Sequence, residues 1–160
     1  MTPSATPSPH ALLDLEIAGY KALLRLLDAE CDALRRVDRD GIESTAEAKS
    51  TQVRALEQLA RLREAALDAR GLPATAAGIA LWLSDGDANA AASATAWTTL
   101  LDLARATRTA NARNGRLIER QRRHYDAAFD ALSTAAGRAT VYGADGRPQA
   151  TTLGRALAAI

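Results

Sequence analysis

The strongest constraint on this chain is a heptad pattern near its N-terminus. Its members recur in alternating steps of four and three residues, which places them on one seam of an α-helix that must pack against another helix. The pattern predicts a helix over residues 10–38, ended by the breaker pair Asp40-Gly41. The seam consists of Leu13, Ile17, Tyr20, Leu24, Leu27, Cys31 and Leu34.

A second, weaker seam predicts a helix over residues 42–69. Two cations, Lys49 and Arg63, interrupt it. Because only a short turn separates the two seams, the helices are expected to form an antiparallel hairpin that ends at Gly71 and Pro73. The second seam consists of Ile42, Ala46, Lys49, Val53, Leu56, Ala60, Arg63 and Leu67.

A short apolar helix is expected over residues 74–83, and a long one over residues 88–136, ended by Gly137. If straight, the long helix would extend roughly 70 Å. The residues on one side of the long helix form a seam whose steps again alternate between three and four residues. The long seam consists of Trp97, Leu100, Ala104, Thr107, Asn111, Asn114, Ile118, Gln121, Tyr125, Ala128, Leu132 and Ala135.

These patterns predict an all-α fold, an antiparallel helical bundle or coiled-coil hairpin with one long C-terminal helix and flexible termini. Hydrophobic residues make up 48% of the chain, but only one is Phe, so thin helical pairs are favoured over a thick core. We expect a disordered lead-in at 1–9, where three prolines fall, a helical domain at 10–137, and a flexible tail at 138–160 without a strand pattern.

Charge and targeting signals point to a cytoplasmic protein. The net charge of +1 gives no global attraction to nucleic acid or to a membrane. Arginines crowd residues 105–123, but no aromatic residues alternate with them, so we expect a solvated face paired with the acidic first helix rather than a nucleic-acid site. No signal peptide or membrane span is expected, and the single Cys31 suits a reducing compartment. The acidic residues of the first helix are Asp14, Glu16, Asp28, Glu30 and Asp32.

The sequence contains no pattern that indicates an enzyme. Cys31 occupies a seam position, which is typical of a small core residue. No zinc-type cluster and no phosphate-binding loop occurs, so we expect no catalytic residues, metal or cofactor. A helical phosphotransfer protein would need an accessible histidine on a helix, and His124 is the candidate for that alternative.

Polar residues on the long seam have two interpretations. Asn111, Asn114 and Gln121 could fix the register of helices inside the bundle, because their amides must find partners. Alternatively, this stretch is uncovered and receives a partner protein. Gly115 favours the second interpretation, because glycine inside a helix costs about 1 kcal/mol relative to alanine and is usually kept where another backbone approaches.

Three stretches together resemble the FlgN family of flagellar export chaperones. Ala48-Lys49-Ser50 continues into an apolar helix half, Asn111-Ala-Arg-Asn114-Gly115-Arg-Leu117-Ile118 forms a central motif, and Val141-Tyr142-Gly143-Ala-Asp-Gly146-Arg stands in the tail. The order and spacing of these stretches carry the resemblance, which covers residues 13–147. Such proteins are cytosolic, have no catalytic residues, and bind the C-terminal helical parts of the hook–filament junction proteins FlgK and FlgL before secretion.

The resemblance also implies two binding sites. The client is expected on the long helix between 111 and 132, and the export gate protein FlhA at Tyr142 and Gly143. A structural or adaptor coiled coil that self-associates is the alternative, and both a monomer and a weak homodimer fit the sequence. The expected client-binding residues are Asn111, Asn114, Gly115, Leu117, Ile118, Gln121, Tyr125 and Leu132.

Overall fold

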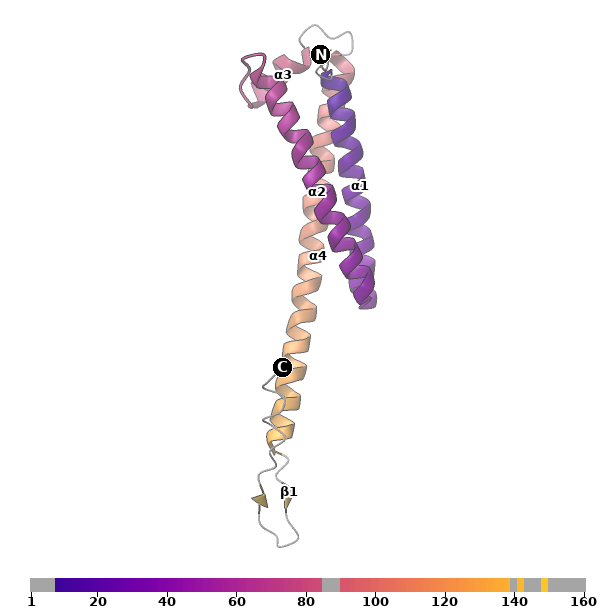
Figure 1. Cartoon of the computed structure of the whole chain (residues 1–160), viewed down its shortest axis with the longest axis vertical. Coiled ribbons are helices and arrows are strands. Elements are labelled where there is room, and N and C mark those ends of the chain that lie inside the picture. The colour runs from indigo at the N-terminus through magenta and orange to yellow at the C-terminus, as the bar shows by residue number, and fades with distance from the viewer. Residues whose placement is uncertain (1–7, 85–89, 139–140, 143–147, 150–160) are drawn as a thin grey trace, which may run out of the picture. The chain divides into compact units, whose positions relative to one another are not determined.

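The computed structural model describes residues 8–84, 90–138, 141–142 and 148–149, and these are helical almost throughout. Helices α1 (Pro9–Arg36) and α2 (Arg39–Asp68) lie side by side as the predicted hairpin (Figure 1). The Ser8 hydroxyl accepts a hydrogen bond from the Ala11 amide and so caps α1. Pro9 takes the first helical position, where an N–H would have no partner, so the helix includes the last residue of the expected lead-in.

The turn between α1 and α2 lies earlier than the sequence predicted. Val37 adopts the left-handed conformation, with φ of 56° and ψ of 37°, and its amide bonds back to the last turn of α1. Asp38 then caps α2, because its carboxylate accepts a hydrogen bond from the Gly41 amide at 3.0 Å. The expected break at Asp40-Gly41 is therefore wrong, since both residues lie in the first turn of α2.

Close contact between the hairpin helices depends on Gly19. A Cβ atom there would lie only 2.7 Å from a methyl group of Leu56, and the Gly19 carbonyl oxygen accepts a hydrogen bond from the Gln52 side chain at 3.1 Å. Gln52 thus faces α1, whereas the predicted seam residue Val53 is exposed. Thr45 likewise replaces Ala46 on the inner face. The rest of the α2 seam faces inward as predicted, at Ile42, Lys49, Leu56, Ala60, Arg63 and Leu67.

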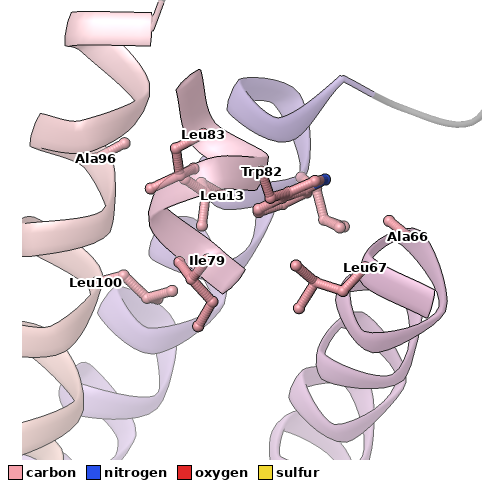
Figure 2. Close-up of a cluster of buried hydrophobic side chains, with 9 residues drawn as sticks. Leu13, Ala66, Leu67, Ile79, Trp82, Leu83, Ala96 and Leu100 are labelled. Carbon is pink, nitrogen blue, oxygen red and sulfur yellow. The ribbon is translucent and has the colours of Figure 1, made fainter. Parts of the chain in front are cut away.

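A short apolar helix, α3 (Ala76–Ser84), closes one end of the hairpin. Its tight connection to α2 requires Gly78, where a Cβ atom would collide with the carbonyl oxygen of Pro73. Trp82 is the largest fully buried side chain of the core formed there. Four helices contribute to this core, and Figure 2 labels all of its residues except Leu12: Leu12 and Leu13 from α1, Ala66 and Leu67 from α2, Ile79, Trp82 and Leu83 from α3, and Ala96 and Leu100 from α4.

Helix α4 (Ala90–Arg138) has 49 residues, against 28 in α1 and 30 in α2, so the predicted excess length is confirmed. It continues through Gly137, the residue expected to end it, for one further position. The chain divides into two compact units, residues 1–117 and 118–160, and α4 contributes to both.

Two short strands stand outside the predicted all-helical pattern. Strands β1 (Val141–Tyr142) and β2 (Pro148–Gln149) pair antiparallel, with Val141 opposite Gln149. Each has only two residues, too few for the alternating polarity that identifies a strand in sequence. The all-α fold class is confirmed, with this ladder as its one addition in the part of the chain that the structure describes.

We expect Val37→Gly to raise the free energy of unfolding by about 1 kcal/mol, because a left-handed backbone is costly for a β-branched residue and nearly free for glycine. Val37→Asn should give a smaller gain, since asparagine tolerates this conformation. Urea unfolding followed by circular dichroism checks both. A loss of stability in the glycine variant would show that the Val37 side chain contributes more than its backbone conformation costs.

Candidate partner-binding site on helix α4

Two buried carboxylates tie the helices of the first unit together, and the first of them is Glu30. Glu30 on α1 is 3% exposed, and it accepts hydrogen bonds from Lys49 on α2 at 2.6 Å and from the Asn114 amide on α4 at 3.0 Å. The same Asn114 amide nitrogen also donates to the Leu27 carbonyl oxygen at 2.7 Å. A buried charge is tolerated only when it is paired and hydrogen-bonded, so Glu30 fixes where α2 and α4 lie against α1.

The second buried carboxylate repeats this arrangement two heptads earlier on α1. Glu16, 2% exposed, accepts a hydrogen bond from Arg63 on α2 at 2.8 Å. The Arg63 guanidinium also lies over the Trp97 ring of α4, 5.4 Å from its centre. The two cations that seemed to weaken the α2 seam are therefore its ion-pairing residues, and Glu16 and Glu30 belong to the core rather than to a solvated face.

The polar residues of the α4 seam divide into two groups. Asn114 is fully buried and has the register-fixing role described above. Asn111 is exposed, and Ala110 occupies the inward position instead, so its predicted place on the packed seam is wrong. Gly115 is exposed, with no atom within 4 Å of where its Cβ would lie, and Leu117 is half-buried.

Beyond Leu117, the large apolar residues of α4 are exposed. We call Ile118, Tyr125, Phe129 and Leu132 the exposed stripe; their exposed fractions are 46%, 57%, 64% and 70%. Gln121, also expected in the client site, is half-buried. Phe129 was not predicted, although its position four residues after Tyr125 and three before Leu132 could have identified it.

Charged residues of this part of α4 pair within the helix, and one of them, Arg122, lies one heptad before Phe129 of the exposed stripe. Arg122 donates hydrogen bonds to Glu119 at 2.9 Å and to Asp126 at 2.9 Å. The hydrogen bond from Arg122 lowers the pKa of Glu119 below its ordinary value. In the first unit, Arg113 binds Asp28 of α1 at 2.9 Å, which raises the Arg113 pKa. The expected pairing with α1 is thus found at Arg113, whereas Arg105, Arg122 and Arg123 pair within α4.

The remaining predicted residues do not belong to the exposed stripe. Tyr142 belongs to β1, with its backbone opposite Pro148, and Gly143 lies outside the described residues. His124 is exposed beside Tyr125, with ring centres 6.2 Å apart. Among the residues that the structure describes, no group of His, Cys, Asp and Glu side chains is arranged to hold a metal ion.

Comparisons with known proteins show the family and the fold of this chain. The family model of the FlgN protein matches residues 1–150. The chain belongs to the FlgN family. A solved structure from Pseudomonas aeruginosa, assigned as the flagella synthesis protein FlgN, is similar to it, with 28% sequence identity and a TM-score of 0.62 over 67% of this chain and 83% of that one. No curated protein matches the chain.

Membership of the FlgN family identifies the chain as a flagellar export chaperone, a protein that binds substrates of flagellar export. The sequence resemblance is thereby confirmed at the level of the family. No helix in the described ranges is both long and apolar enough to cross a membrane.

We expect Asn114→Ala to lower the free energy of unfolding by about 2–3 kcal/mol, because the buried Glu30 carboxylate and the Leu27 carbonyl would each lose a donor. Asn111→Ala, three residues away and exposed, is the matched control and should change stability by less than about 0.5 kcal/mol. Urea unfolding measures both variants. Equal effects of the two substitutions would contradict the role given to the Asn114 amide.

Proposed function

We propose that this FlgN family member binds the C-terminal helical regions of the hook–filament junction proteins FlgK and FlgL in the cytoplasm and delivers them to the export gate protein FlhA. The exposed stripe carries the client-binding part of the proposal. Four large apolar side chains on one helix are seldom left in water without a partner, since contiguous exposed apolar surface marks interaction sites.

The position of the exposed stripe supports a helical client. Tyr125 and Leu132 are one heptad apart, and Phe129 lies between them, as in a helix face built to pack against another helix. An amphipathic helix that lays its apolar side on such a face is a recurrent recognition mode. The terminal regions of the junction proteins are helical by the family resemblance, so their chemistry fits this surface.

The predicted client residues take different parts in this proposal. Ile118, Tyr125 and Leu132 are exposed and can contact a client directly. Asn111 and Gly115 are exposed too, but they belong to the first unit. Asn114 is buried by α1, so a direct contact with the client would require α1 to leave α4 at that point.

We expect the double variant Phe129→Ser, Leu132→Ser to bind a C-terminal fragment of FlgK or FlgL at least tenfold more weakly, because it removes two large apolar contacts typical of interface hot spots. Its melting temperature should stay the same, since both side chains are exposed. Isothermal titration against each purified fragment measures the affinity.

A matched control for this experiment exists in the hairpin. Leu15 on α1 and Leu62 on α2 are exposed to a similar degree, 54% and 52%. The double variant Leu15→Ser, Leu62→Ser should bind the fragment like wild type. If this control loses affinity and the α4 variant keeps it, the client site lies on the hairpin instead.

For the export gate, we expect Tyr142→Ala to weaken binding to the cytosolic domain of FlhA by roughly 2 kcal/mol, a typical loss for an aromatic hot spot. Affinity for the isolated client fragment and the melting temperature should both stay near the wild-type values. The two titrations are run in parallel, with client present in the gate experiment. A fall in melting temperature would assign Tyr142 a structural role. Unchanged affinity for FlhA would show that the docking site lies elsewhere on the chain.

A further inference from the structure

We propose that residues 150–160, called here the tail segment, cover the C-terminal part of the exposed stripe, Phe129 and Leu132, until a client displaces them. The tail segment and these two residues belong to the same compact unit. Displacement by a client rests on the function proposed above, whereas the contact with α4 can be tested on the protein alone. The tail segment lies outside the described residues, and its sequence supplies the pattern.

The apolar residues of the tail segment have the same spacing as the last three members of the exposed stripe. Both sets follow a step of four residues and then a step of three. Such steps place three side chains on one face of a helix, so two helices of this kind can pack along a common line of contact. The two sets are Leu153, Leu157 and Ile160 in the tail segment, and Tyr125, Phe129 and Leu132 on α4.

The tail segment is too short to form a stable helix without a packing surface. An isolated helix of fewer than roughly 12–15 residues is marginal in water, and Gly154 lowers the helical propensity further. Most helical stability in proteins comes instead from an apolar face that packs against a neighbour. Phe129 and Leu132, which are 64% and 70% exposed, offer such a neighbour within the same unit.

The β1–β2 ladder directs the tail segment back toward α4. β1 begins three positions after Arg138, the last residue of α4, and Val141 pairs with Gln149 in the antiparallel ladder. The chain therefore leaves β2 in the direction opposite to that of β1. With residues 150–152 extended and the rest helical, the tail segment spans about 24 Å, and the path from Val141 back to Phe129 is also about 24 Å. Its last apolar residues thus reach the stripe.

Charge complements this apolar match. The charged residues of α4 between positions 125 and 137 are Asp126 and Asp130, and the charged residue of the tail segment is Arg155. Asp126 pairs with Arg122 at 2.9 Å, whereas no cation among the described residues pairs with Asp130. Arg155 therefore brings a positive charge to an acidic part of α4, which favours this segment as the occupant.

A weak contact is sufficient because the tail segment is tethered to α4. A short linker gives an effective concentration in the millimolar range, so a contact with a sub-millimolar Kd would cover the stripe most of the time. The client then has to compete, and its apparent affinity falls in proportion to the fraction of molecules with a free stripe. Such a cover keeps two large apolar side chains out of water and still yields to a client.

Hydrogen exchange on the full chain tests the contact without a client. The amides of residues 151–160 should exchange about threefold more slowly in wild type than in Leu157→Glu, as expected for a stripe that is covered two-thirds of the time. Ala158→Glu is the matched control, because it adds the same charge away from the apolar side of the predicted helix, and it should keep the slow exchange. The stripe variant Phe129→Ser, Leu132→Ser should lose it.

Titration with a C-terminal fragment of FlgK or FlgL tests the displacement. Leu157→Glu should bind the fragment about threefold more tightly than wild type, because the tail segment no longer competes. Ala158→Glu should bind as wild type does. Weaker binding by Leu157→Glu would overturn the proposal, since the tail segment would then contribute to the client contact instead of opposing it.

The cover and the proposed function fail in different ways. Equally fast exchange in wild type and Leu157→Glu would overturn the cover, and the function would stand if the stripe variant still lost the client. Slow exchange that depends on Phe129 and Leu132, with the same client affinity in every variant, would uphold the contact and place the client site elsewhere. Exchange that becomes faster when wild type is diluted would overturn the intramolecular contact in favour of a second copy of this chain.

Discussion

The packing of the first unit depends on buried carboxylates that cannot be left alone. Glu30 would be unstable in an apolar seam by itself, so its position is acceptable only while Lys49 and Asn114 both reach it. Hydrophobic seams built of leucine and alanine tolerate sliding by a heptad, whereas an ion pair with a fixed third donor does not. The buried charge therefore sets the register of three helices.

The second carboxylate gives this register its rigidity along the hairpin. Glu16 and Glu30 are two heptads apart on α1, and their partners Arg63 and Lys49 are two heptads apart on α2. Two such pairs hold α1 and α2 in one register, because sliding one helix along the other would break both ion pairs at once. The close contact at Gly19 lies between them and depends on the same alignment. A thin bundle with few aromatic residues thus gains a unique arrangement from polar contacts.

In the proposed function one helix serves two purposes, because its N-terminal part belongs to the bundle and its exposed stripe receives the client. The register holds the N-terminal part of α4 in the bundle up to Asn114, and the apolar pattern of α4 continues well past that point. A chaperone for export needs an apolar face that stays soluble before the client arrives. Charged side chains that pair with one another on the same part of α4 limit its apolar surface, which suits binding that must later be reversed.

Much of this protein was determined by its sequence alone. The α1 seam, the hairpin, the long last helix and the FlgN family relationship all followed from local periodicity and short motifs, which tertiary contacts do not alter. Only the tertiary structure decided the polar details: that Lys49 and Arg63 face glutamates inside the bundle, that Asn114 is buried while Asn111 is not, and that the turn falls at Val37. Heptad spacing shows that a residue faces a neighbour but not which atoms that neighbour presents, and the free energy of a buried charge depends entirely on those atoms.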